Sequence, residues 1–404
     1  MKNRVPLTLV FLTVFIDLLG FGILIPLLPT FAYNVLHVDE TAIGIAIAVY
    51  SLTQFFFNPV FGNLSDKYGR RPLIVVSLLL NATGYVIFAF TDMYLVLIIS
   101  RVIAGIGGSS IGVAQAYIAD VTTKENRAKG MGLIGSAFGL GFVFGPLIGG
   151  YLSAFGYQVT GFVSAGFSFI AFLSTVFLLP ESLSKDKMHI GHRKLFDIKA
   201  ARNVFRNKAI GVSIILFFIL TFSVANMYGT FALLGSKNFG FTDRQNGYLF
   251  AVIGLSSVIV QGGLLNVLAK FMDDRKLIMF GSVCMIIGLG MIPYGGGFWG
   301  IAIIVAILSL GTGTLQPTIL SLVSKFSKEH EQGMVLGTNQ SISALGRVLG
   351  PLWGGFSFEF FGHQYPFLTG AFFSSLILIF STIFLSKFLV HSHAAADKPK
   401  LEEL

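Results

Sequence analysis

The sequence is poor in charged residues and contains a single cysteine. Charged side chains make up 12% of the 404 residues, about half of the share usual in soluble domains, whereas apolar residues make up 54%. A soluble domain of this size could not hide so much apolar surface from water. The single cysteine, Cys284, excludes a disulfide scaffold and a multi-cysteine metal site.

The chain also lacks the motifs of ATP-driven and catalytic proteins. It has no G-x-x-x-x-G-K-S/T phosphate loop, no H-E-x-x-H and no G-x-S-x-G. The seven histidines show no metal-ligand spacing. We therefore expect no enzyme, no cofactor and no metal, and we expect that any energy for transport comes from an ion gradient. A membrane enzyme is the least favoured alternative, because no acid, base and nucleophile cluster together.

Long apolar runs take up most of the chain. A helix needs about 20 apolar residues to cross a bilayer, and twelve runs meet that length. The sequence thus predicts an all-α integral membrane protein with twelve transmembrane helices. The first run is too long for a signal peptide and contains Asp17, so we expect it to remain as a span. The runs are 6–28, 42–63, 72–91, 94–118, 131–154, 159–180, 209–234, 246–268, 277–294, 299–323, 333–358 and 365–389.

The basic residues alternate between the loops. Of the 28 Lys and Arg residues, 24 fall in one set of loops and the termini, and only Lys237 and Arg244 fall in the other set. The positive-inside rule places both termini and the basic loops in the cytoplasm. The net charge of +9 is therefore mostly a signal of topology, and we expect contact with membrane lipid and no nucleic-acid partner. This sidedness fits a bacterial cytoplasmic (inner) membrane.

An internal repeat divides the chain. Residues 141–150 read GFVFGPLIGG and residues 346–355 read GRVLGPLWGG, so both follow G-x-x-x-G-P-x-x-G-G. Two duplicated six-helix halves with a substrate site between them are the plan of many secondary transporters. We expect an N-terminal half (1–180), a cytoplasmic linker (181–208), a C-terminal half (209–390) and a disordered tail (391–404). The glycines allow close helix packing, and the same seam is suited to sliding.

Several motifs resemble those of the major facilitator superfamily. Residues 62–72 read GNLSDKYGRRP, which is similar to the superfamily's signature loop G-x-x-x-D-x-x-G-R-R/K. Span 4 contains RVIAG at 101–105, and the glycine-proline pattern of span 5, with Gly145 and Pro146, resembles the motif of its antiporters. The resemblance implies a twelve-helix major facilitator fold, alternating access and a monomer.

Within that superfamily the chain is most similar to twelve-span drug/proton antiporters, in particular tetracycline efflux proteins. The stretches AYIADVT at 116–122, LPES at 179–182 and DLLGFG at 17–22 carry this likeness. The chain departs from the pattern of tetracycline exporters at two positions. Gly84 and the region of Met285 stand where those exporters share an aspartate. The resemblance implies export of amphipathic small molecules or drugs, with the substrate itself left open.

Asp17 and Arg101 are the predicted proton-coupling residues. A carboxylate near the middle of a bilayer costs about 2.5–3.5 kcal/mol on insertion scales, so Asp17 must face a cavity, find a cation or bind a proton. Arg101 stays protonated and must be paired or hydrated. We expect Arg101 to approach Asp17 when the carboxylate is ionised and to leave it when Asp17 is protonated. The alternative is a fixed pair that never titrates.

A second group, at the cytoplasmic ends of the spans, is predicted to be a conformational switch. Two acids and a fork-shaped guanidinium suit a charge-assisted latch, and ordinary interfacial ion pairing is the alternative. The resemblance implies that this loop stabilises one conformation across the halves. The predicted switch residues are Gly62, Asp66, Gly69, Arg70, Asp120, Arg127, Gly145 and Pro146.

Polar side chains inside the spans are the candidates for substrate binding. Gln54 and Gln261 are similar in position to glutamines that matter in tetracycline exporters, and Asn226 and Gln340 are further candidates, although amides also join helices. Arg347 in span 11 either pairs with Asp17 or backbone carbonyls, or attracts an anionic or zwitterionic substrate group. Phe138 and Phe231 are candidates for an apolar drug pocket.

The sequence therefore predicts a proton-coupled antiporter that exports amphipathic small molecules, with the substrate and protons as partners. The first alternative is a proton-coupled transporter of a specific anionic or zwitterionic metabolite. A receptor or channel on a transporter fold is disfavoured, because a channel does not need the switch loop.

Overall fold

The structure is a computed structural model that describes residues 4–123, 127–183, 204–327 and 332–385. These residues are almost entirely helical, and no strand occurs among them. Most of the predicted linker and the predicted tail lie outside these ranges. The predicted all-helical class is confirmed.

The N-terminal helices account for the first six predicted spans. Two of these spans are interrupted: the first breaks near Pro26 and the fourth at Gly108 and Ser109. Proline and glycine weaken the helical hydrogen-bond ladder, and neighbouring helices cover the break. The helices are α1 (Arg4–Leu24), α2 (Leu27–Asn34), α3 (Glu40–Tyr68), α4 (Arg70–Ala89), α5 (Tyr94–Gly107), α6 (Ser110–Val121), α7 (Arg127–Leu152) and α8 (Tyr157–Leu178).

The C-terminal helices account for the last six spans. The eighth span is continuous from Asp243 to Phe271 through a π-helical segment at Val260–Leu264. The last predicted span is described as far as residue 385. The helices are α10 (Lys208–Phe239), α11 (Asp243–Ile259), α12 (Leu265–Phe271), α13 (Asp274–Met291), α14 (Phe298–Lys325), α15 (Gln332–Phe360) and α16 (Tyr365–Phe380).

Eleven of these segments, within the described ranges, are long and apolar enough to cross a membrane. The remaining one, α15, forms as a helix of 29 residues at the predicted eleventh span but has a more polar sequence. Its polar residues include Asn339, Gln340 and Arg347. A helix with these side chains needs protein or water beside it, because lipid offers no hydrogen-bond partner.

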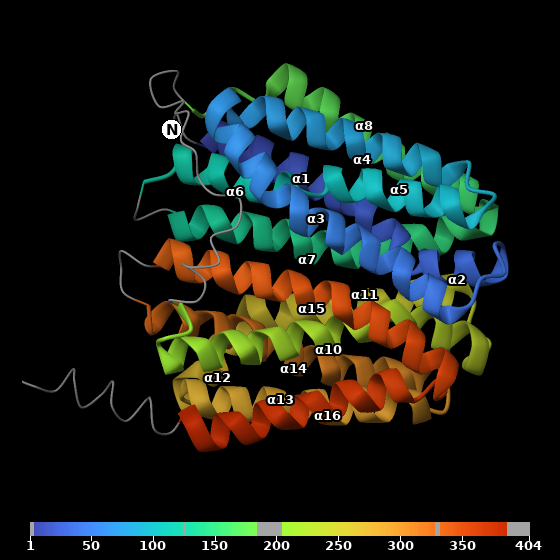
Figure 1. The fold of residues 1–404 in the computed structure, drawn as a ribbon, viewed down its shortest axis with the longest axis vertical. Helices are drawn as coiled ribbons and strands as arrows, with labels where there is room; N and C mark the ends of the chain where they lie inside the picture. The colour runs from blue at the N-terminus through green and yellow to red at the C-terminus, as the bar shows by residue number, and fades with distance from the viewer. Residues whose placement is uncertain (1–3, 124–126, 184–203, 328–331, 386–404) are drawn as a thin grey trace, which may run out of the picture.

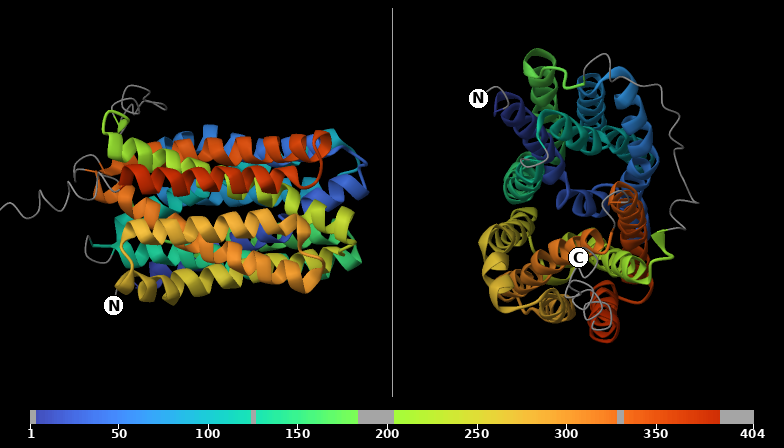
Figure 2. Two further views of the ribbon diagram at one scale, coloured as in Figure 1. Left: turned by 90° about the horizontal axis from the view of Figure 1, so that it is seen from below. Right: turned by 90° about the vertical axis from the view of Figure 1, so that its left-hand side faces the viewer.

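The helices gather into two groups, one of N-terminal and one of C-terminal helices (Figure 2). In the first group α1 packs on α7 and α8, and α4 packs on α5 and α8. In the second group α10 packs on α15 and α16, and α13 packs on α14 and α16. The most extensive contacts between the groups are those of α3 with α15 and of α7 with α11, and α10 also contacts α2 and α3.

Helix α1 begins at one end of the bundle, on the left in Figure 1. We call this the near end; α3 and α8 finish there, and α4 begins there. The opposite end, where α2 leads into α3 and α10 into α11, is the far end. The residues of the basic loops that the structure describes lie at the near end, and Lys237 and Arg244 lie at the far end.

The two groups are packed tightly at the far end. A Cβ atom added to Gly44 of α3 would collide with the backbone of Pro351, and one added to Gly355 of α15 would collide with the backbone of Glu40. We call the two most extensive contacts between the groups, α3 with α15 and α7 with α11, seams. On the α7–α11 seam, Gly150 of α7 meets the backbone of α11 at Gly247. These helices approach so closely because glycine has no side chain.

At the near end, the faces of α3, α15 and α7 that carry these glycines are not in contact with the described residues of the other group. Gly62 is 18 residues after Gly44, and Gly337 is 18 residues before Gly355, which is about five helical turns in each case. A Cβ added to Gly62 or Gly337 meets no atom within 4 Å. Gly132, 18 residues before Gly150, is equally open. Each seam is therefore closed at the far end and open at the near end.

Candidate functional site

Asp17 lies on α1 and points into the N-terminal group of helices. Its side chain is held by two neutral residues: Asn81 Nδ2 on α4 donates to Oδ1 and Oδ2 at 3.0 and 3.1 Å, and Ser168 Oγ on α8 donates to Oδ1 at 3.0 Å. Asp17 is 8% exposed and Asn81 is 2% exposed. Among the described residues no cation lies within ion-pair distance of this carboxylate.

Arg101 lies on α5 and is 3% exposed. Its Nη2 donates to Ser100 Oγ at 3.0 Å, its guanidinium carbon lies 5.6 Å from the centre of the Phe88 ring, and its Nε has no partner among the described residues. A direct pair with Asp17 is absent from this conformation.

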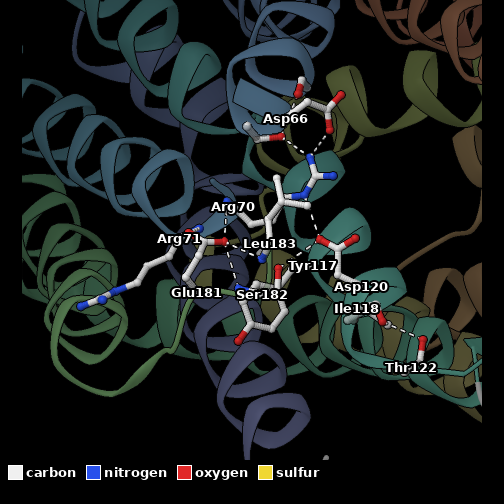
Figure 3. A network of polar contacts seen from close by, with 12 residues as sticks. Asp66, Arg70, Arg71, Tyr117, Ile118, Asp120, Thr122, Glu181, Ser182 and Leu183 are labelled. Carbon is white, nitrogen blue, oxygen red and sulfur yellow. Dashed lines mark hydrogen bonds and ion pairs between the residues drawn. The ribbon is translucent and has the colours of Figure 1, made fainter. Parts of the chain in front are cut away.

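The predicted switch residues Asp66, Arg70 and Asp120 do come together at the near end (Figure 3). Arg70 Nε donates to Asp120 Oδ2 at 3.0 Å, and its Nη1 donates to Asp66 Oδ1 at 2.5 Å and to Ser65 Oγ at 2.7 Å. All four residues belong to the N-terminal group, so the network does not bridge the halves in this conformation. The side chain of Arg127 lies outside the described residues.

Glu181 anchors the start of α4 in the same network (Figure 3). Its Oε1 and Oε2 accept hydrogen bonds from the backbone N–H groups of Arg70 and Arg71 at 2.9 and 3.1 Å. These are the unpaired donors of a helix N-terminus, which favour a carboxylate. Gly69 stands beside Glu181 with a φ of 100°, and a Cβ there would collide with the carboxylate.

Gly145 and Pro146 lie on α7 where this helix packs against α1 and α11. Gly145 packs on the backbone of α1 at Gly22, and Gly247 of α11 packs on the Pro146 carbonyl. The first contact lies inside the N-terminal group, and the second joins the two groups.

The candidate substrate residues are spread over several environments. Gln54 Nε2 donates to the Gly108 carbonyl at 2.9 Å and to Tyr50 Oη at 3.3 Å, both in the N-terminal group. Asn226 is fully buried and donates to the Pro366 carbonyl at 2.5 Å, so in this conformation it joins α10 to α16. Gln261 and Gln340 are exposed.

Arg347 is half-buried on α15. No carboxylate of the described chain lies within ion-pair distance of its guanidinium. The predicted pairing with Asp17 is not formed in this conformation.

A chain of aromatic rings crosses between the two groups. Phe21 of α1 lies 5.1 Å from Tyr50 and 6.3 Å from Phe142, measured between ring centres. Phe142 of α7 lies 6.2 Å from Tyr228 of α10, which stacks on Phe250 at 5.8 Å. The predicted pocket residues Phe138 and Phe231 flank this chain, next to Phe142 and Phe250. The rings form an apolar surface between the halves.

Several polar contacts hold the two groups of helices together at the far end. The sequence did not predict them. Lys237 of α10 pairs with Glu40 of α3, and Glu359 Oε2 of α15 accepts from the Thr41 backbone at 3.1 Å. Lys237 also lies 4.5 Å from the centre of the Tyr33 ring. One feature of the sequence could have indicated the role of Lys237, since it is one of only two basic residues in the sparsely charged loops.

These features define a membrane transporter with two helical halves that are closed against each other at one end. The profile of the Major Facilitator Superfamily matches residues 10–351 and 236–403. The chain belongs to this superfamily, and it is an integral membrane transport protein.

Its relatives include drug-resistance proteins. It is 28% identical over 369 residues to Multidrug resistance protein 2 of Bacillus subtilis (strain 168), covering 89% of this chain and 90% of the relative. It is 30% identical over 360 residues to the class C tetracycline resistance protein of Escherichia coli, covering 87% and 89%. The predicted resemblance to multidrug and tetracycline resistance proteins is confirmed.

Solved structures share the fold. The human organic anion transporter MFSD10 superposes with a TM-score of 0.72 at 24% identity, covering 94% of this chain and 100% of that chain. The nucleoside transporter NupG gives a TM-score of 0.76 at 14% identity, covering 95% and 98%. These similarities describe the fold alone.

Proposed function

We propose that this protein is a proton-driven antiporter that exports amphipathic small molecules from a bacterial cell by alternating access. The observation that carries the proposal is Asp17, an ionisable side chain within a membrane-spanning helix that has neutral partners only. Placing an ionisable side chain within a bilayer costs free energy, so such residues usually have a function. A carboxylate without a paired cation can exchange its charge for a proton.

The uneven seams support the alternating-access part of the proposal. The far end is closed by glycine contacts and by the Glu40–Lys237 pair, whereas Gly62 and Gly337 face open space at the near end. With both termini in the cytoplasm, as the loop charges predict, this conformation accepts substrate from the cytoplasm. The Asp66–Arg70–Asp120 network stands at the open end, in place to engage the other half when that end closes.

The relatives support the substrate class. Proteins named for resistance to several drugs and to tetracycline align along nearly the whole chain. The aromatic surface of Phe21, Phe142 and Tyr228 offers apolar contacts to an amphipathic molecule, and small-molecule sites are typically apolar with few polar groups.

The test uses inverted membrane vesicles that carry an acidic interior. Cationic, zwitterionic and anionic compounds are added in turn while the internal pH is followed by fluorescence. We expect at least one compound to discharge the pH gradient with the wild type and no compound to do so with Asp17→Asn. The matched control, Asp92→Asn, removes an exposed carboxylate and should behave as wild type. Discharge by Asp17→Asn would refute the assignment.

A second candidate is transport of an anionic compound, and Arg347 favours it. A half-buried guanidinium without a carboxylate partner in the described chain is suited to a carboxylate, sulfonate or phosphate. In the same vesicles, Arg347→Gln should abolish the response to anionic compounds and keep the response to cations. An unchanged anion response would exclude this role.

A further inference from the structure

A small cavity adjoins Asp17 inside the N-terminal group of helices. It lies between α1, α4 and α6 and has a volume of about 10 Å³, close to the least that holds one water molecule. Its polar lining is the Asp17 carboxylate with the hydroxyl-bearing residues Thr13 and Ser110. A water molecule there would have the several polar partners that buried water needs.

The cavity leads from Asp17 toward the near end. Thr13 is about one helical turn before Asp17, and Val10 is about two turns before it, on the same face of α1. Leu179, which follows the end of α8 at the near end, also lines the cavity. Thr13 Oγ1 lies 3.4 Å from Thr175 Oγ1 of α8, which continues the line of hydroxyl groups. All of these residues belong to the N-terminal group, so the cavity lies away from the space between the halves.

Three buried polar atoms on α4 and at the break between α5 and α6 have no hydrogen-bond partner among the described residues. They are Ser77 Oγ, Asn81 Oδ1 and Ser109 Oγ. Asn81 Oδ1 faces Gly107 of α5, because a Cβ added to Gly107 would collide with it. Most buried polar groups bind protein or ordered water. Of these residues Asn81 contacts Asp17, and none of the three lines the cavity.

We propose that this cavity is a water site that delivers protons to Asp17 from the near end, by a route separate from the path of the substrate. The inference rests on the proposed function, because it presupposes that Asp17 carries the coupled proton. A hydronium ion in the cavity gives its proton to a carboxylate oxygen, which leaves a neutral water and a neutral carboxyl group. The reverse step returns the proton.

The surroundings of Asp17 suit this route. The titratable groups on the helices around Asp17 are Tyr85 of α4, whose ring lies beside Gly20 of α1, and Tyr50 of α3, whose ring lies 5.1 Å from that of Phe21 of α1. Arg101 of α5 makes no ion pair with Asp17. Asn81 and Ser168 occupy the remaining sides of the carboxylate. The cavity is thus the side of Asp17 that leads toward the near end.

A separate route has a mechanical consequence. Proton and substrate then occupy different spaces and do not have to displace each other. Protonation removes the charge that accepts the hydrogen bonds of Asn81 and Ser168, so it changes how α1 is held against α4 and α8. Coupling would pass through these helices.

The test fills the cavity or removes its hydroxyl group and follows protonation of Asp17 itself. Full-length protein in liposomes is exposed to a pH step, and infrared difference spectroscopy records the carbonyl band of the protonated carboxyl group. Asp17→Asn identifies the band. Ala114→Val fills the cavity, and Thr13→Val replaces the hydroxyl by a methyl group. Ala137→Val is the control, since Ala137 is equally buried in the same apolar cluster but does not line the cavity.

We expect Ala114→Val and Thr13→Val to slow the band's appearance at least about tenfold, which equals about 1.4 kcal/mol in the barrier, and to leave its final size unchanged. Ala137→Val should match the wild type. Wild-type rates in both cavity variants would overturn the separate route while Asp17 remained the proton site. A band that persists in Asp17→Asn would overturn the route and the proposed role of Asp17 together. Thr13→Val decides the question if Ala114→Val does not fold.

Discussion

At the scale of single residues, Asp17 is defined by the neutrality of its neighbours. Asn81 and Ser168 donate three hydrogen bonds to the carboxylate and bring no charge. Hydrogen bonds to a charged group contribute about 1.5–3 kcal/mol each, which offsets part of the cost of burying the carboxylate. Asn81 is therefore a positioning residue for Asp17 as well as a link between α1 and α4.

Replacing Asn81 by leucine should destabilise the protein through Asp17. Asn81→Leu keeps the side-chain volume and removes the donor to both carboxylate oxygens, so we expect a loss of about 1.5–3 kcal/mol. Thermal unfolding in detergent measures it. In the Asp17→Asn background the loss should be much smaller, because no buried charge then lacks a donor. Equal losses in both backgrounds would show that Asn81 acts by packing alone.

At the scale of helices, the turn between α3 and α4 is built around Gly69. Its φ of 100° and ψ of 159° belong to a region that is essentially restricted to glycine. The Glu181 carboxylate caps α4 in the space that a side chain on residue 69 would occupy. This turn holds Arg70 at the start of α4, where its side chain reaches Asp66 and Asp120.

Gly69→Ala should therefore cost more than backbone strain alone. Gly156 provides a matched control, because it has nearly the same dihedral angles (φ 105°, ψ 151°) and open space around it. We expect about 1–3 kcal/mol from strain in either variant and an additional loss in Gly69→Ala from displacing Glu181. Unfolding temperatures of the two variants compare the costs, and equal values would contradict the capping role.

At the scale of the whole molecule, the two halves meet along seams that are closed at one end only. Gly44 and Gly355 are packed at the far end, and Gly62 and Gly337 are open at the near end of the same helix faces. A transporter that alternates needs two arrangements of similar energy. The open glycines are placed so that the near end can close in the same way.

Two valine variants on α3 should shift this equilibrium in opposite directions. Gly44→Val collides with the backbone of α15 and should open the far end, whereas Gly62→Val meets no atom in this conformation and should hinder closure of the near end. Distances between spin labels at the ends of α3 and α15 report the populations. Identical distance distributions in the two variants would contradict the assignment of the seams.

Composition and residue pattern were sufficient to predict the helical class, the spans and the uneven distribution of basic residues between the loops. The length of each apolar run indicates which segments cross a bilayer. The glycine-proline repeat and the signature loop indicate the superfamily. Asp17 was singled out because a charged residue within a span is rare, and Asp66, Arg70 and Asp120 because two acids and a guanidinium at the span ends suit a latch.

Which residues contact one another follows from the packing of the helices and could not be predicted from the sequence. It joined Asp17 to Asn81 and Ser168 and left it apart from Arg101, and it placed Asn226 in helix packing. It also decided which end of each seam is closed. Partners from distant helices depend on how the helices rotate and approach, and hydrophobic periodicity does not fix this for helices that are apolar on most sides.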